Sequence, residues 1–202
     1  LRISTIPSFA ARWLLPRLGD FIATCPDVDV EVQSSHRAAD VKGGEVDIGI
    51  RFDTGPHPGL YSERLMRDWL FPVCSPEFAK KYALCDTSGI DGVPLMHSER
   101  EPWSSWFPAA GIVADEPEHG ILFNDSALML QAAAAGQGLC LARQSIVYDE
   151  LQSGRLVRPF STYVESPFSY FFVCRREKLA APPIAAFRTW IFRQIKNIPL
   201  LD

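Results

Sequence analysis

The sequence opens with LRISTIPSFAARWLLPRLGDFI, residues 1–22, and this stretch decides the fold class. Residues 1–6 are predicted to form a short strand, and from Phe9 onward apolar side chains recur at the spacing of a helix. Ser8 lies between them, where its hydroxyl can cap the helix while first-turn N–H groups stay free. Ligands of open α/β sheets bind beyond the carboxyl ends of the strands. This order of strand, turn and helix therefore predicts either a binding residue or an ordinary N-cap at Ser8.

The same plan recurs in residues 121–142, ILFNDSALMLQAAAAGQGLCLA. A strand there leads to the capping cluster Asp125-Ser126, then to an alanine-rich helix ending at Gly136, and then to another strand. Two helix starts, at Ser8 and at Asp125-Ser126, are thus expected to carry polar groups toward a ligand.

Other segments complete an α/β pattern. Alternating residues 28–32 and residues 46–51 are predicted strands that join the first strand in a largely parallel sheet. Residues 69–73 and 168–174 are nearly continuous apolar strands, each expected to cross between two subdomains, and a final amphipathic helix starts at Pro182-Pro183.

Composition narrows the class of protein. A formal net charge of −4 and an isoelectric point near 5.6 disfavour a surface that holds a nucleic-acid backbone. The five cysteines are widely spaced and include no C-x-x-C pair, which favours reduced thiols in a cytoplasmic protein. No apolar run has transmembrane length, and the four histidines show no metal-ligand spacing. We therefore expect no membrane, no metal and no cofactor.

Residues 6–18, IPSFAARWLLPRL, followed by Phe21 and Pro26-Asp27-Val28, resemble the start of the effector-binding domain of LysR-type transcriptional regulators. The likeness is strongest to the subgroup that contains the glycine-cleavage activator and the β-lactamase regulator. Residues 123–139 match a second segment in the right order, and the likeness runs along essentially the whole chain.

The resemblance implies a type 2 periplasmic-binding-protein-like α/β fold. Two regulatory subdomains, residues 1–68 with 169–202 and residues 69–168, are expected to enclose a ligand cleft. A winged helix-turn-helix domain is expected to precede residue 1 and to make the DNA contacts. The resemblance also implies a homodimer, assembled into a tetramer in the full-length protein. The implied dimer contacts are Trp13, Leu14, Leu18, Phe21, Met129 and Ala133.

Effector-binding candidates follow from the same resemblance. Ser8, Ser126 and Tyr170 match positions that hold or surround ligand in similar proteins, although Tyr170 is equally compatible with a core role. Further candidates are Asp40, Arg51, Cys74 and Asp125. Helix N-termini suit a carboxylate, but Asp125 opposes an anion, so an amino acid, a small carboxylate or a peptide-like molecule is expected. For Arg51 an internal ion pair is at least as compatible as a ligand contact.

Three alternatives remain open from the sequence. A solute-binding protein of a transport system shares the implied fold. A hydrolase would use Cys74 or Ser126 as nucleophile with a distant histidine such as His97, but no such histidine is adjacent in sequence, so we expect no enzyme. A purely structural oligomerisation domain is the third.

Overall fold

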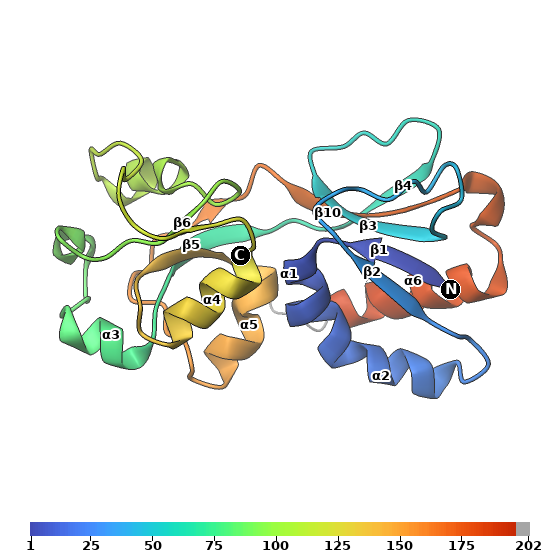
Figure 1. The fold of residues 1–202 in the computed structure, drawn as a ribbon, viewed down its shortest axis with the longest axis horizontal. Coiled ribbons are helices and arrows are strands. Elements are labelled where there is room, and N and C mark those ends of the chain that lie inside the picture. Colours follow the sequence, from blue (N-terminus) through green and yellow to red (C-terminus); the bar gives the residue numbers. More distant parts are fainter. Residues whose placement is uncertain (197–202) are drawn as a thin grey trace. The chain divides into compact units, whose positions relative to one another are not determined.

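The computed structural model describes residues 1–196, which fall into two compact units (Figure 1). Unit 1 consists of Leu1–Asp68 together with the segment from Pro167 onward, and unit 2 consists of Trp69–Ser166. The chain therefore passes between the units twice. Within the described residues, no helix is long and apolar enough to cross a membrane.

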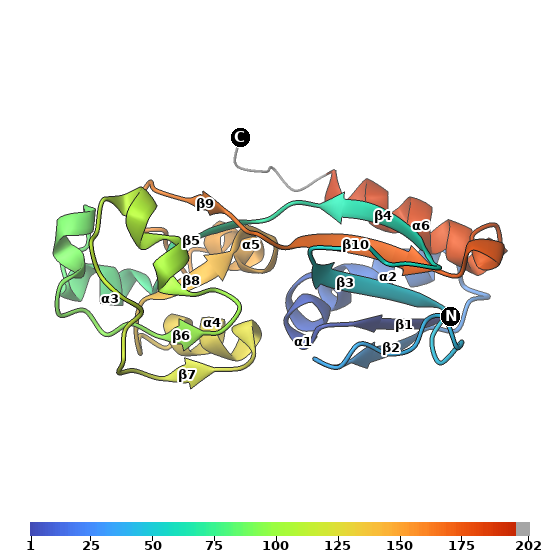
Figure 2. The same ribbon diagram turned by 90° about the horizontal axis from the view of Figure 1, so that it is seen from above.

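Unit 1 is built on a five-stranded sheet in the order β2-β1-β3-β10-β4 (Figure 2). Its strands are β1 (Arg2–Thr5), β2 (Glu31–Ser34), β3 (Ile48–Asp53), β4 (Tyr61–Met66) and β10 (Ser169–Cys174). β1 pairs in parallel with β2 and β3, whereas β10 pairs antiparallel with β3 and β4. The expected parallel arrangement is confirmed for the first three strands, and β10 returns the chain into the same sheet in the opposite direction.

Helices cover one face of this sheet. They are α1 (Pro7–Phe9), a π-helical segment (Ala10–Leu14), α2 (Leu15–Thr24) and α6 (Pro182–Ile195), and a 3₁₀ turn (Arg176–Lys178) connects β10 to α6. In Figure 1, α2 and α6 lie side by side below the strands. Their contact is aromatic: the ring of Phe21 meets Phe187 at 5.3 Å and Trp190 at 5.5 Å between centroids. The apolar stripe of the first helix therefore faces the core of its own unit.

Several boundaries differ from expectation; β3, for example, covers Ile48–Asp53 and not residues 46–51. The first helix begins at Pro7 with Ile6 as its N-cap, and Ser8 lies inside the helix with 2% of its surface exposed. The expectation that Ser8 caps the helix is wrong, because proline has no N–H to satisfy and its fixed φ suits the first helical position. The second strand begins at Glu31, so residues 28–30 precede it.

Unit 2 combines two small sheets with three helices. An antiparallel sheet has the order β8-β5-β9, and a parallel pair joins β6 to β7. The strands are β5 (Trp69–Val73), β6 (His97–Ser98), β7 (Leu122–Phe123), β8 (Cys140–Arg143) and β9 (Val164–Glu165). The helices are α3 (Pro76–Lys81), α4 (Ser126–Ala134) and α5 (Gln144–Gln152), with 3₁₀ turns at Thr87–Ile90, Trp103–Ser105 and Phe107–Ala110. The predicted strand, helix and strand of residues 121–142 are confirmed as β7, α4 and β8.

The core of unit 2 is aromatic. Trp103, Trp106 and Phe107 are buried together, with Trp103 and Phe107 stacked at 5.6 Å. Both indole N–H groups are satisfied, since Trp103 donates to the carbonyl of Met96 and Trp106 to that of Thr162. These partners let two large side chains be fully buried without losing a hydrogen bond.

Candidate functional site

A buried polar network surrounds Ser126, the first residue of α4. The guanidinium of Arg143, at the end of β8, lies with its Nε 2.7 Å from Glu101 Oε1. The Ser126 hydroxyl lies 3.0 Å from both carboxylate oxygens of Glu101 and accepts a hydrogen bond from Arg143 Nη2, also at 3.0 Å. Ser98 donates its hydroxyl hydrogen to Glu101 Oε2 at 2.5 Å. One carboxylate thus connects β6, β8 and the start of α4.

The network has almost no access to solvent. The Arg143 and Glu101 side chains are both 0% exposed, and Ser98 and Ser126 are buried. A charge in such surroundings is tolerated only when it is paired and hydrogen-bonded. Burial, and then the negative charge of Glu101, raise the pKa of the neighbouring Cys140 thiol far above its ordinary value. Cys140 therefore stays a neutral thiol.

Asp125 is the N-cap of α4, as expected. Its Oδ1 accepts from the backbone N–H groups of Ala127 at 2.9 Å and Leu128 at 3.2 Å. Two first-turn N–H groups of α4 are therefore occupied by a carboxylate of the chain itself, in keeping with the expectation that Asp125 opposes an anion at this helix start. The start of this helix already has a carboxylate neutralising its positive end.

In unit 1, Tyr170 lies on β10 and is completely buried. Its ring packs between those of Phe9 and Phe52, each at 4.6 Å between centroids. Phe9 follows Ser8 in α1, and Phe52 belongs to β3. The aromatic contacts therefore fix Tyr170 relative to the helix that carries Ser8.

Arg51, on β3, holds a loop. Its Nη1 donates to the hydroxyl of Ser4 at 3.2 Å, and its Nη2 donates to the carbonyl of Ala39 at 2.7 Å. Burial lowers the pKa of the guanidinium, and the nearby Asp53 opposes that effect. Gly49, two residues earlier, leaves room for it, since a Cβ there would lie 2.9 Å from Arg51 Cζ. Arg51 thus links β1 to the loop after β2.

Asp40 belongs to that loop. Its Oδ1 accepts from the N–H of Gly43 at 2.7 Å, while its own N–H donates to Glu45 Oε2 at 2.8 Å. Beside it lies a polar cavity of about 230 Å³. The cavity is lined by Ser4, Gln33, Ser35, Arg37, Ala38, Ala39, Asp40 and Glu45. Asp40 therefore orders the loop and lines a cavity of unit 1.

Cys74 belongs to the aromatic core of unit 2. It is 0% exposed, and burial raises the pKa of its thiol to about 11. A thiol with that pKa is almost entirely protonated at neutral pH and is a poor nucleophile. Cys74 therefore serves packing.

The hydrolase alternative required a histidine beside a nucleophile. His97 instead has its Nε2 2.7 Å from the carbonyl oxygen of His119, and its Nδ1 lies 3.9 Å from Glu116. Among the described residues, no hydrogen bond joins His97 to Ser126 or Cys74. The same part of the chain contains no group of three or more His, Cys, Asp or Glu residues placed to hold a metal ion.

Comparison with known sequences identifies the family. A sequence model described as the LysR substrate binding domain matches residues 1–196. The chain belongs to this family. The glycine cleavage system transcriptional activator of Escherichia coli (strain K12) is 36% identical over 193 residues, covering 95% of this chain and 63% of that protein. The AmpR transcriptional activator of Pseudomonas aeruginosa is 33% identical over 193 residues, covering 95% and 64%. The chain thus spans just under two thirds of the length of these LysR relatives.

Solved structures of LysR domains have the same fold. The effector domain of AmpR from Pseudomonas aeruginosa is similar with a TM-score of 0.83 and 31% identity, covering 97% of this chain and 95% of that one. A Citrobacter freundii effector-binding domain is similar with a TM-score of 0.82 and 26% identity, covering 96% and 98%. That domain carries three substitutions: threonine to valine, serine to alanine and tyrosine to phenylalanine. The relatives are transcriptional regulators, so nothing supports a transport protein.

The LysR dimer contacts implied by the sequence need correction. All six residues named for that role are buried inside a single chain: Trp13, Leu14, Leu18, Phe21, Met129 and Ala133. Helical spacing finds an apolar stripe but does not tell whether it faces the protein's own core or a partner. The apolar residues that the same helices expose are Leu15 at 52%, Ile22 at 47% and Leu128 at 53%.

Glu101, Arg143 and Ser98 were not predicted from the sequence as part of the site. Glu101 lies in the polar stretch SEREP, where nothing distinguishes it from a surface carboxylate. Arg143 offered one usable signal, because it ends a run of buried apolar strand residues and is the last residue of β8. The pairing of Arg143 with Glu101 joins residues far apart in the sequence.

Proposed function

We propose that this chain is the effector-binding part of a cytoplasmic transcriptional regulator, in which side-chain hydroxyl groups bind a small molecule. The buried Glu101–Arg143 pair is the observation that carries the proposal, since it gives the Ser126 hydroxyl one fixed orientation. Fixing a polar group in advance reduces the entropy that binding must overcome. DNA contacts belong to a domain outside this chain, in keeping with its net charge of −4.

The Citrobacter freundii domain supports the choice of hydroxyl groups. Each of its three substitutions removes one hydroxyl and keeps a side chain of similar shape. The separation in sequence between Ser8 and Ser126 equals that between the first two substituted residues of that domain. The separation between Ser126 and Tyr170 is one residue longer than that between its second and third substituted residues. Ser8, Ser126 and Tyr170 are therefore our proposed effector contacts, whereas Arg51, Asp40 and Asp125 order the chain around them and Cys74 has no part.

The network also indicates which chemical group Ser126 recognises. A hydroxyl has one hydrogen and accepts two hydrogen bonds. Glu101 has no hydrogen to give as a carboxylate, so Ser126 donates to it, and Arg143 takes one acceptor position. Ser126 therefore has one acceptor position left, which suits an N–H group of the effector. An amino acid or a peptide-like molecule fits this better than a simple carboxylate.

Thermal shift in the presence of candidate effectors tests the proposal. The probes are the standard amino acids, their D-forms and alanine dipeptides, each compared with its deaminated acid. A ligand that binds the folded state raises the melting temperature. We expect an amine-bearing probe to stabilise the chain, and Ser8→Ala, Ser126→Ala or Tyr170→Phe to weaken that effect. Ser104→Ala, a change at an exposed serine, is the matched control.

Two results contradict this reading. Equal stabilisation by the deaminated acid would show that Ser126 does not read an N–H group. Stabilisation that survives all three hydroxyl substitutions would show that the effector does not bind at Ser8, Ser126 and Tyr170. The similarity to the Citrobacter freundii domain would then not support these residues as the site.

The resemblance to LysR regulators further supports a homodimer, with a tetramer in the full-length protein. We place the subunit contacts on the exposed apolar residues Leu15 and Ile22 of α2 and Leu128 of α4. Leu15→Glu and Leu128→Glu should shift the chain toward monomer in sedimentation velocity experiments. Val113→Glu, at a fully exposed residue, should not. A wild-type chain that is monomeric at micromolar concentration would contradict the dimer.

A further inference from the structure

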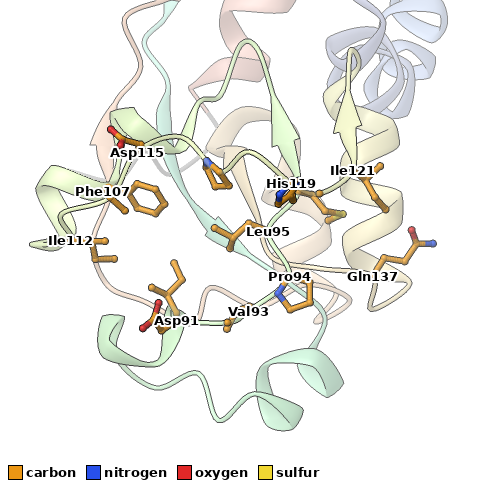
Figure 3. Close-up of a pocket in the computed structure, with 16 residues that line it drawn as sticks. Asp91, Val93, Pro94, Leu95, Phe107, Ile112, Asp115, His119, Ile121 and Gln137 are labelled. Atoms are coloured by element: carbon orange, nitrogen blue, oxygen red, sulfur yellow. The ribbon is translucent and has the colours of Figure 1, made fainter.

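We propose that unit 2 contains a second small-molecule site, separate from the effector hydroxyls, that binds an apolar molecule carrying an amine. The site is a cavity of about 540 Å³ (Figure 3). That volume lies in the range of roughly 300–1,000 Å³ that is usual for small-molecule pockets. Ser98, Glu101, Ser126 and Arg143 are not among the residues that line it.

The lining of this cavity is mainly apolar. Two segments provide most of it, residues 90–96 and residues 112–121, with Phe107 and Gln137 completing the wall. Figure 3 shows Leu95 in the middle, with Phe107 and Ile112 on one side and Ile121 and Gln137 on the other. Burying an apolar ligand here removes both its own surface and that of the wall from water.

Charge selects the kind of ligand. Asp91 and Asp115 line the cavity on the side of Phe107 and Ile112, and the lining includes neither lysine nor arginine (Figure 3). Neither carboxylate is hydrogen-bonded or ion-paired within the described residues. Two unpaired carboxylates beside an apolar wall favour a cation and disfavour an anion.

The wall is held in place by the protein itself. Glu116 accepts hydrogen bonds from the backbone N–H groups of Trp103 at 3.1 Å and Ser104 at 2.8 Å. The next anchor is the contact of 2.7 Å between His97 Nε2 and the carbonyl oxygen of His119. These contacts anchor residues 112–120 on both sides of Pro117.

The floor of the cavity, formed by residues 94–96, is also held by backbone hydrogen bonds. Leu139 donates to the carbonyl of Pro94 and accepts from the N–H of Met96, each at 2.9 Å. Gly120 passes so close to this floor that an added Cβ would lie 2.4 Å from the carbonyl oxygen of Leu95. The cavity is therefore built by backbone contacts and does not depend on a ligand to form.

A matched set of three probes tests the site: 4-phenylbutylamine, 4-phenylbutan-1-ol and 4-phenylbutyrate. They share one apolar body and differ only in charge. Isothermal titration should show the amine binding at least tenfold more tightly than the alcohol, and the acid more weakly than both. In the double variant Asp91→Asn/Asp115→Asn, the affinity for the amine should fall to the affinity for the alcohol.

Three further variants locate the binding. Ala114→Trp adds a large side chain at an exposed wall residue and should remove binding of amine and alcohol alike. Asp27→Asn makes the same charge change at an exposed residue of unit 1 and should leave the amine unaffected. Ser126→Ala should also leave it unaffected.

The proposal is overturned if none of the probes binds. It is equally overturned if amine and alcohol bind with equal affinity, or if amine binding survives the double variant or Ala114→Trp. Loss of amine binding in Ser126→Ala would assign the probe to the effector hydroxyls instead.

Discussion

Glu101→Gln tests the buried ion pair most directly. The substitution keeps the shape of the side chain and removes the negative charge that lies 2.7 Å from Arg143 Nε, in surroundings where both side chains are 0% exposed. At an effective dielectric constant of about 20, two unit charges ~4 Å apart attract each other by about 4 kcal/mol. Removing one partner of a buried pair costs roughly 3–5 kcal/mol. We therefore expect Glu101→Gln to lower the free energy of unfolding by about 3–5 kcal/mol.

The double variant Glu101→Gln/Arg143→Met separates pairing from packing. It removes both charges, so no uncompensated charge remains, and it should be less destabilised than the sum of the single variants by more than about 1 kcal/mol. Urea denaturation followed by circular dichroism and tryptophan fluorescence measures all four proteins. Arg193→Met is the control, because Arg193 pairs with Asp20 at 3.2 Å on the surface.

The surface control should stay within experimental error of the wild type, since exposed pairs are screened by water. Strict additivity of the two single variants would refute the reasoning, because it would mean that Glu101 and Arg143 contribute independently. A Glu101→Gln variant as stable as the wild type would refute the claim that the Arg143 charge depends on this partner.

Further predictions concern thiols, a glycine and a carboxylate. The thiols of Cys74, Cys140 and Cys174 are buried with raised pKa values, so Ellman's reagent should titrate them only after denaturation, whereas the exposed Cys85 should react in the native protein. Gly120→Ala should lower the free energy of unfolding by more than about 1 kcal/mol in urea, because its φ is +137° and the added Cβ meets the carbonyl of Leu95. Burial raises the pKa of Asp47, but hydrogen bonds from Arg2 outweigh it and the net pKa is lowered. Asp47→Asn should therefore destabilise the chain at pH 7. The difference should begin to shrink as the pH falls below about 4, the ordinary pKa of an unfolded Asp, and should be lost only as the pH passes through the lower pKa of the folded carboxyl; a series of urea denaturations from pH 7 downward through this range measures this.

Local chemistry explains which elements were predictable. Continuous apolar residues predicted β5 and β10, because a strand covered on both faces has no polar side to break the run. Pro182 and the apolar spacing after it predicted α6, and Asp125 with Gly136 predicted both ends of α4. The Ser8 cap failed because two neighbouring residues, Pro7 and Ser8, both suit a helix start.

The candidate site was only partly predictable. Ser126 and Asp125 follow from their place at a helix start, and Tyr170 from the resemblance. Their surroundings did not follow, since Glu101 and Arg143 are separated by many residues and neither has a distinctive local pattern. The dimer residues failed for a related reason, because a stripe of apolar side chains has the same spacing whether it meets α6 or another subunit.

The sequence by itself thus indicated the family, through the resemblance of residues 6–18 and 123–139. It also determined the α/β class and the order of strands and helices, because these depend on the period of apolar residues and on turn and cap residues within a few positions. The tertiary structure alone decided that Glu101 pairs with Arg143 and orients Ser126, that the first-helix stripe faces its own core, and that Asp91 and Asp115 share one apolar cavity. These features are contacts between distant segments, whose partners are chosen by packing and by the cost of leaving a buried charge unpaired.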